Sequence, residues 1–356
     1  MTRLLAAFVL CVLPCSALAQ TRPAKTGWEI EGIGGLAISR LPSEGDVAFP
    51  AAGATITTTS VLVPSRSVPT WFFGDGAALL NGVNARFGVT PIVPLDAALG
   101  AVGLNRSTGA AFGVRLRRGL TPKWTAEISL DVMRGSADIT ADLVNAAETT
   151  RASFESAFGA LFGTSPLFVN TQIAATLDRP SGSSRDIALT GAAVRNFTAF
   201  GAFRPYVTLG GGIIASSGNA ALTLRGHYQF SIAGEVPINE TDVLTVRAVQ
   251  DRKLVGLVGG GVRRSLTPRL GLTIDVRALI GGQGSRLLVD ARPDIARATP
   301  ADFIESFTNP AIQFSNNPST GRRSSLGDPG LDGFAVFSGT GIQVRVIATA
   351  GISFRF

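Results

Sequence analysis

The last fifteen residues of the chain, from Ile342 to Phe356, are IQVRVIATAGISFRF. The even positions are all apolar, whereas odd positions carry polar side chains such as Gln343, Arg345 and Ser353. Successive side chains of a β-strand point to opposite faces, so this alternation predicts a strand with one apolar and one polar face. The segment is about three times as long as an ordinary soluble strand, which is long enough for a tilted strand to span a bilayer.

Seven further segments show the same period of two. They are residues 27–39, 112–117, 124–132, 186–197, 204–216, 254–266 and 270–280. In the segment that begins at Trp124, for example, Ile128 and Leu130 alternate with Glu127, Ser129 and Asp131. The chain therefore contains eight candidate strands, each with one face suited to lipid.

The composition points in the same direction. Charged residues make up 16% of the chain, against about 25% in an average soluble domain, while 45% of the residues are hydrophobic and 42 are glycine. Beyond the first twenty residues there is no run of eighteen apolar residues, which excludes a transmembrane helix. A closed β-barrel reconciles these features because it distributes its apolar side chains over alternating positions.

The start of the chain has the pattern of an export signal. A basic residue, an apolar stretch and small residues follow one another, so we expect residues 1–19 to be a cleavable signal and 20–356 a single outer-membrane barrel domain. Both cysteines, Cys11 and Cys15, fall within the signal, which leaves no disulfide in the mature chain. A lipid anchor on Cys15 is the alternative, which Pro14 directly before it disfavours.

The connections between the candidate strands are of two kinds. Three are short, and two of them are near copies, RRGLTPKW at 117–124 and RRSLTPRL at 263–270. The long ones span about 40–108, 135–185, 217–252 and 282–340. Short periplasmic turns and long extracellular loops are typical of bacterial outer-membrane barrels. The sequence thus predicts an all-β, up-and-down antiparallel barrel of eight strands, or ten to twelve if 221–230 and 243–250 add a hairpin.

Three segments resemble a known family. The ending GISFRF, the strand FRPYVTLGGGI and the first strand WEIEGIGGLAIS are similar to the small outer-membrane barrels of the OmpA and opacity type. The resemblance implies a place in the cell outer membrane of a Gram-negative-type envelope. It also implies that the machinery that inserts barrels recognises the alternating C-terminal residues Ile352, Phe354 and Phe356.

The polar face of the strands carries charges of both signs. The inward set comprises Glu29, Glu31, Arg115, Arg117, Glu127, Asp131, Asp275, Arg277 and Arg345. Side chains fill the interior of an eight-stranded barrel, so we expect these charges to form a packed, paired network and to leave no open pore. The alternative is that they only keep the second face of each strand wet.

The long loops contain apolar residues at helical spacing. One such stretch follows Ile139, another is ADFIESFTNP at 301–310, and a third lies at 73–88. The loop aromatic clusters that they define are Phe154, Phe158, Phe162, Phe303 and Phe307. These side chains could cover the barrel mouth as a lid; packing of the loops against one another and the rim is the interpretation that we favour.

Catalytic, metal and cofactor sites are not indicated. His227 is the one histidine, no G-x-S-x-G motif accompanies it, and the mature chain has no cysteine. The formal charge is +7, but the basic residues form no cluster with aromatic side chains on which bases could stack. This argues against binding of nucleic acid. Basic residues at the turns, Arg117, Arg118, Arg263 and Arg264, are instead expected to meet anionic phospholipid.

The expected function follows from these features. We predict a non-enzymatic, integral outer-membrane barrel without cofactors, with a closed lumen and surface loops that serve envelope integrity, adhesion or binding of a surface ligand. Its expected partners are outer-membrane lipid and the barrel-assembly machinery. Passive transport of small or apolar solutes is the alternative. A secreted β-sandwich is a third, which the exposed terminal phenylalanines disfavour.

Overall fold

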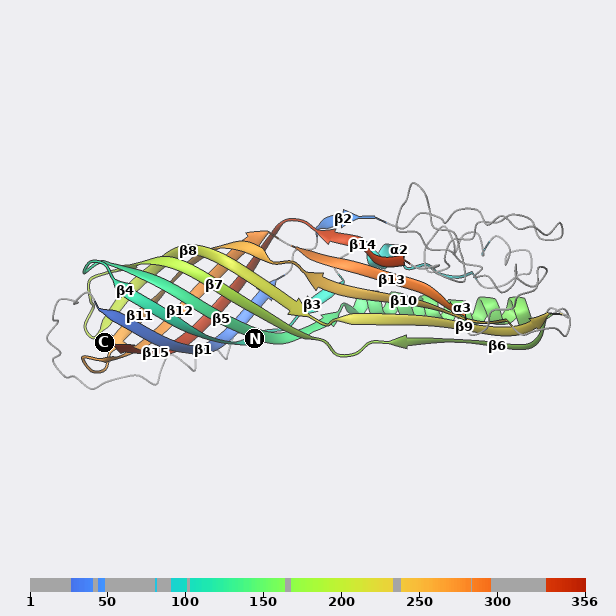
Figure 1. Ribbon diagram of the computed structural model, residues 1–356, viewed down its shortest axis with the longest axis horizontal. Helices are drawn as coiled ribbons and strands as arrows, with labels where there is room; N and C mark the ends of the chain where they lie inside the picture. The colour runs from blue at the N-terminus through green and yellow to red at the C-terminus, as the bar shows by residue number, and fades with distance from the viewer. Residues whose placement is uncertain are drawn as a thin grey trace.

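The computed structural model describes residues 27–40, 44–48, 81, 91–100, 103–163, 168–232, 238–282, 284–295 and 331–356. These residues form a β-barrel at one end of an elongated arrangement and a second sheet with a long helix at the other (Figure 1). The C-terminus lies at the end of the barrel that is farther from the second sheet (Figure 1).

Eight antiparallel strands close the barrel. In order around it they are β1 (Trp28–Arg40), β4 (Gly109–Gly119), β5 (Trp124–Ile139), β7 (Ser183–Asn196), β8 (Phe203–Gly218), β11 (Lys253–Ser265), β12 (Leu270–Gly282) and β15 (Ile342–Arg355). The last strand, β15, pairs with both β12 and β1, and β5 pairs with β7, so the sheet has no free edge at this level. The predicted eight-stranded antiparallel barrel is confirmed, and the alternative of ten to twelve strands is wrong.

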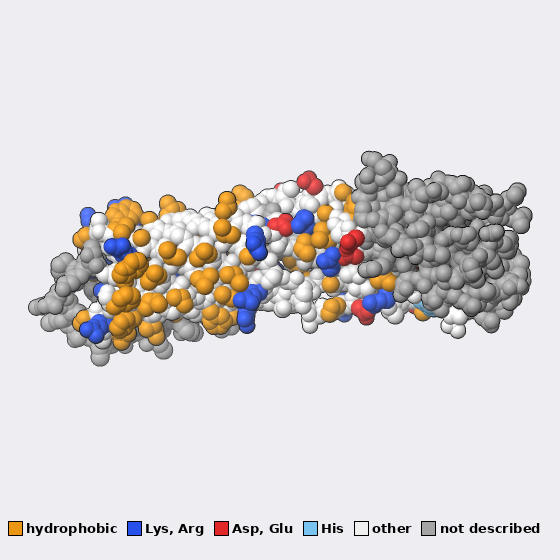
Figure 2. Space-filling model, viewed as in Figure 1, with side chains coloured by type: hydrophobic (Ala, Val, Ile, Leu, Met, Phe, Trp, Pro, Cys, Tyr) orange, Lys and Arg blue, Asp and Glu red, His pale blue; other side chains and the backbone are white. Residues whose placement is uncertain are grey.

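The alternation of the sequence appears as alternation of exposure. On β5 the side chains of Ile128 and Leu130 face outward, whereas Glu127 and Asp131 are buried inside the barrel. Figure 2 shows hydrophobic side chains spread over the outside of the barrel, with Lys and Arg side chains bordering this surface at both ends. An apolar surface of this extent would be unfavourable in water and is the surface that a lipid bilayer covers.

The two copied turns fold alike. In the turn between β4 and β5, the Leu120 amide donates to the Trp124 carbonyl, and Thr121 Oγ1 accepts the Trp124 amide at 3.0 Å. In the turn between β11 and β12, Thr267 Oγ1 accepts the Leu270 amide at 2.9 Å in the same way. The recurring threonine thus satisfies backbone donors that a tight turn leaves without a partner in the strand ladder.

A second, six-stranded sheet lies beyond the barrel mouth. Its order is β2 (Gly45–Val47), β14 (Leu331–Gly339), β13 (Ser285–Ile295), β10 (Ile238–Gln250), β9 (Ala221–Ile232) and β6 (Phe168–Asp178). Strands of this sheet continue barrel strands after a short break: β6 precedes β7, β9 follows β8, β10 precedes β11, β13 follows β12 and β14 precedes β15. The predicted hairpin at 221–230 and 243–250 therefore exists, but it extends this sheet outward and does not widen the barrel.

The break before β15 depends on a glycine. Gly341 adopts a φ of 99°, a backbone conformation that residues with a Cβ rarely tolerate. It stands between the end of β14 at Gly339 and the start of β15 at Ile342. A glycine at this point lets the chain change direction as it passes from the outer sheet into the barrel wall.

The outer sheet has a core of its own. Helix α3 (Ala141–Gly163) packs against β6 and β9, and the short helix α2 (Asp96–Leu99) packs against α3. Its buried core includes Leu143 and Phe154 from α3, and Leu224 and Leu244 from the sheet. The helix predicted after Ile139 is thus present. Within the described ranges, no helix is long and apolar enough to cross a membrane.

Two short elements complete the described structure, and some predictions cannot be compared with it. Strand β3 (Leu104–Arg106) pairs with the outer end of β5, and β2 pairs with β14. The proposed signal at 1–19, the aromatic pair Phe303 and Phe307, and the helix at 73–88 apart from Asn81 lie outside the described residues.

Candidate functional site

The candidate site is the interior of the barrel, where the charged side chains gather. All nine predicted lumen residues, which are Glu29, Glu31, Arg115, Arg117, Glu127, Asp131, Asp275, Arg277 and Arg345, are buried there. They come from β1, β4, β5, β12 and β15, strands whose alternation directs every second side chain inward. Seven of them belong to one connected group of ion pairs, and the other two lie in different surroundings.

One half of the connected group centres on Asp275. Arg115 approaches it with two nitrogens, at 2.7 and 3.3 Å, and Arg277 donates through Nε at 2.8 Å. Tyr206 Oη donates to the same carboxylate at 2.9 Å, and Thr349 Oγ1 donates at 2.6 Å. Five hydrogen bonds from four side chains thus surround this single buried carboxylate, as a charge in a low-dielectric interior requires.

The other half centres on Arg117. Its Nε donates to Glu127 at 2.7 Å, and its Nη1 lies 2.6 Å from Glu31 and 3.4 Å from Glu29. Arg263 reaches the same end of the network, 3.7 Å from Glu29. Three buried arginines, the partly buried Arg263 and four carboxylates are therefore interlocked in this part of the barrel. The more exposed Arg355 joins the same group, 3.1 Å from Glu29.

One interaction of this network bridges opposite walls of the barrel. Arg277 on β12 donates through Nη1 and Nη2 to both carboxylate oxygens of Glu127 on β5. Three strands separate β5 from β12 in either direction around the ring, so these two strands face each other across the lumen. Side chains from opposite walls therefore meet inside the lumen at this level.

Two of the predicted lumen residues depart from this network. Asp131 accepts a hydrogen bond from Ser129, and within the described residues it has no ion pair. Arg345 belongs to a separate cluster nearer the extracellular mouth, where its Nε donates to Asp186 at 3.0 Å. The alternation of the sequence shows that both side chains point inward. Their partners depend on the height of each side chain along the barrel, which the sequence of one strand does not give.

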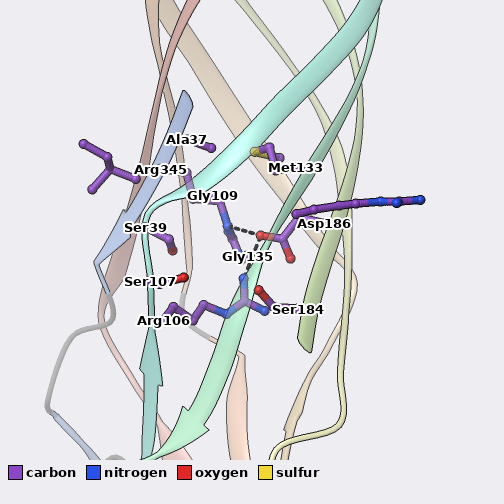
Figure 3. A pocket seen from close by; sticks show the side chains of 12 residues that line it. Ala37, Ser39, Arg106, Ser107, Gly109, Met133, Gly135, Ser184, Asp186 and Arg345 are labelled. Carbon is purple, nitrogen blue, oxygen red and sulfur yellow. Dashed lines mark hydrogen bonds and ion pairs between the residues drawn. The ribbon is translucent and has the colours of Figure 1, made fainter. Parts of the chain in front are cut away.

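The mouth cluster is cationic. Arg106 on β3 and Arg345 on β15 share one oxygen of Asp186 on β7, at 2.7 and 3.0 Å, and β15 and β7 are again opposite strands (Figure 3). A cleft with an empty volume of about 310 Å³ adjoins these side chains and is also lined by Ser39 and Ser184. Two arginines that share one acid leave this end of the lumen with excess positive charge.

An apolar layer separates the two charged groups. Along β15 the inward side chains run from Thr349 in the first network through Ile347 to Arg345 in the mouth cluster. Each of the eight strands contributes to the layer, whose members are Ala37, Ala111, Met133, Ala188, Ile214, Val255, Leu257, Leu279 and Ile347. The inward face is therefore not polar along its whole length, because side chains of both kinds fill the narrow lumen of an eight-stranded barrel.

The analysis of the sequence missed several members of the site. Tyr206, Arg263, Thr349 and Arg355 also belong to the first network, and Arg106 and Asp186 build the mouth cluster. Tyr206 could have been found, because it occupies an inward position of an alternating strand. Arg106 lies in a three-residue strand within a long connection, where no periodicity marks it.

The remaining predicted residues lie away from the lumen. Phe154 and Phe158 stack in the core beneath α3, with ring centroids 4.4 Å apart, while the side chain of Phe162 is outside the described set. The C-terminal Ile352, Phe354 and Phe356 are exposed on the outer side of the barrel.

The single histidine of the chain lies in the outer sheet. His227 lies on β9, where its Nδ1 is 3.0 Å from Thr241 Oγ1. Among the described residues, no group of three or more His, Cys, Asp or Glu side chains could hold a metal ion. The one histidine is thus engaged within a strand pair of the outer sheet.

The closed barrel, its apolar outer surface and its charged interior define the class of this protein. It is an integral β-barrel protein of the cell outer membrane. No family model matches the chain, and no curated protein is significantly similar to it in sequence.

Among solved structures, the outer membrane protein OprG from Pseudomonas aeruginosa has 10% sequence identity and a TM-score of 0.34, with 93% of this chain and 97% of that chain covered. A FadL homologue from Pseudomonas aeruginosa has 7% identity and a TM-score of 0.15, with 92% and 90% covered.

Proposed function

We propose that this protein is a non-enzymatic barrel with a closed lumen, which holds an ordered extracellular sheet at the cell surface for adhesion, surface interaction or envelope integrity. The observation that carries the proposal is the bond of Arg277 to Glu127 between opposite walls. A second bond between opposite walls, from Arg345 to Asp186, supports it. A barrel blocked at two levels is suited to anchoring a surface structure.

The extracellular sheet has one face that is available for binding. Its inner face packs against α3, and its outer face carries polar side chains from neighbouring strands. Thr223 and Thr245 lie 3.2 Å apart across β9 and β10, and the ion pairs Arg225–Asp178 and Arg247–Asp290 flank them. Such a surface favours a polar surface ligand.

The proposal is tested by conductance and folding together. Refolded protein should migrate differently on a denaturing gel before and after heating, and should give no discrete conductance steps in planar bilayers. A matched variant, E127A/R277A, removes the bridge between opposite walls and should raise the conductance if the network is the barrier. Steady porin-sized conductance of the unaltered protein would overturn the closed-lumen proposal.

Passive transport of small solutes is the second candidate. The mouth cleft beside Arg106, Arg345 and Asp186 favours it, because a solute could enter there. Its lining is charged, so a small polar solute suits the cleft better than an apolar one. Uptake by vesicles that contain the unaltered protein, reduced by R345A, would put transport ahead of the anchoring function.

We further propose kinship with the small OmpA-type and opacity-type barrels, supported by the eight strands and the short turns. In this proposal the barrel-assembly machinery recognises Ile352, Phe354 and Phe356 at the end of β15. Their outward exposure at the edge of the lipid-facing surface is compatible with recognition during insertion.

A further inference from the structure

Three arginines of the barrel pair with aromatic rings at the end that carries the short turns. Arg118 on β4 lies over Trp28 on β1, 5.3 Å from the ring centroid. Arg195 on β7 lies 5.8 Å from the centroid of Trp124 on β5, and it also approaches Phe197 of the following turn at 5.7 Å. The third pair is formed by Arg264 on β11 and Phe203 on β8, at 5.7 Å.

Each pair is formed directly across two neighbouring strands. Trp28 is the partner of Arg118 in the ladder of β1 and β4, Trp124 that of Arg195 between β5 and β7, and Phe203 that of Arg264 between β8 and β11. All six side chains occupy outward positions of their strands. The same arrangement thus recurs three times around the lipid-facing side of the barrel, near the strand ends that carry the short turns. We call these six residues the arginine–aromatic ring.

The ring explains the double arginines of the two copied turns. In an alternating strand, adjacent residues point to opposite faces. The first arginine of each pair, Arg117 or Arg263, turns inward to the carboxylate network, whereas the second, Arg118 or Arg264, turns outward to an aromatic. The expectation that all four meet lipid is therefore wrong for Arg117 and Arg263.

The outward arginines carry charge that the protein does not neutralise. Within the described part of the chain, no carboxylate lies within 4.0 Å of Arg118, Arg195 or Arg264. Stacking over a ring fixes the plane of a guanidinium, yet its N–H donors remain free at the edge. Exposed Lys123 and Arg269 in the adjoining turns add two more cations at the same end.

We infer that the arginine–aromatic ring binds anionic phospholipid head groups of the periplasmic leaflet. Aromatic side chains of membrane barrels lie at the interface between hydrocarbon and head groups, which is the depth of the lipid phosphates. A guanidinium held there can donate two parallel hydrogen bonds to a phosphate. Net negative lipids are favoured over zwitterionic ones because the choline group of the latter is repelled by the same cations.

The inference can be tested with the fluorescence of the ring itself. The chain has three tryptophans, and Trp28 and Trp124 belong to two different pairs of the ring. In a W71F background, their quenching by brominated acyl chains reports which lipid adjoins the ring. The measurement compares brominated phosphatidylglycerol with brominated phosphatidylcholine, each mixed into vesicles of unlabelled phosphatidylcholine around the refolded protein.

We expect the W71F protein to associate with phosphatidylglycerol about fivefold more strongly than with phosphatidylcholine, which corresponds to ~1 kcal/mol at one arginine. The variant R118Q/R195Q/R264Q should reduce this ratio to about one. The control R134Q/R179Q/R185Q removes three exposed arginines from the opposite end of the barrel and should retain the ratio. The lysine variant R118K/R195K/R264K keeps the charge but loses the planar fork, and should give an intermediate ratio.

Four outcomes would overturn the inference. The first is equal quenching by the two lipids in the W71F protein. The second is an undiminished ratio in R118Q/R195Q/R264Q. If that variant shows no heat-modifiable, folded band, an undiminished ratio in the lysine variant counts in its place. The third is equal loss of the ratio in the control variant, which would show a general charge effect. The fourth is its abolition by millimolar inorganic phosphate at constant ionic strength, which would indicate a site for free anions.

Discussion

Replacing Arg277 by methionine should destabilise the barrel more than any substitution at an exposed ion pair. Arg277 donates to both oxygens of Glu127 and to Asp275, and all three side chains are almost completely buried. Breaking a buried ion pair from one side typically costs about 3–5 kcal/mol, because the remaining charge stays in a low-dielectric site. We expect about 3 kcal/mol here, since Glu127 keeps Arg117 and Asp275 keeps Arg115.

The assay is urea unfolding of the refolded protein in lipid vesicles, followed by tryptophan fluorescence and by the heat-modifiable band. R225M is the matched control, because Arg225 pairs with Asp178 in an exposed position, and it should cost less than about 1 kcal/mol. The double variant E127L/R277M removes both charges and should be more stable than R277M alone. A free energy of unfolding for R277M within about 1 kcal/mol of the unaltered protein, or a double variant less stable than R277M, would refute the reasoning.

Three further predictions concern other parts of the molecule. F154A should lower the stability of the outer sheet by about 3–5 kcal/mol through loss of a buried ring, seen as faster proteolysis of that sheet while the barrel band stays heat-modifiable. Partial burial alone would raise the pKa of Asp290, but hydrogen bonds from Arg247 and the Gly333 amide lower it below the ordinary value near 3.8. A carboxyl group with a lowered pKa contributes stability above that ordinary value and loses it as the pH falls through the lowered one, so acid should loosen the outer sheet less steeply in D290N than in the unaltered protein, measured by proteolysis between about pH 5 and pH 2. Deletion of Phe356 should reduce assembly in cells, measured as membrane-inserted protein, while spontaneous refolding in detergent continues; equal assembly with and without Phe356 would contradict its proposed role.

The barrel strands could be predicted from the sequence because their environment imposes a local pattern. In a strand between lipid and a narrow lumen, outward apolar side chains alternate with inward ones at every residue. Strand β15 shows this alternation along its whole length. The helix after Ile139 was equally visible, because its buried positions Leu143, Ala147 and Phe154 recur at helical spacing. In both cases residues close in the sequence carry the whole signal.

The outer sheet was only partly visible. The alternation in β9 and β10 was recognised, but β6 pairs with β9 and β14 pairs with β13 across long stretches of chain. Both of these pairings contain irregularities of register, which disturb a strict period of two. Whether such strands join the barrel or extend beyond it depends on the breaks between elements, such as the one at Gly341, and on partners distant in the sequence.

By itself, the sequence determined that the chain forms an eight-stranded membrane barrel and which charges point inward, because both follow from alternation within single strands. Only the tertiary structure decided which charges meet. Arg277 finds Glu127 on the opposite wall, while Arg345, two inward positions from Thr349 on β15, joins Asp186 beyond an apolar layer. The physical reason is that the tilt and stagger of strands around a closed barrel set the height of every side chain. The sequence of one strand does not determine the heights of side chains on the other strands.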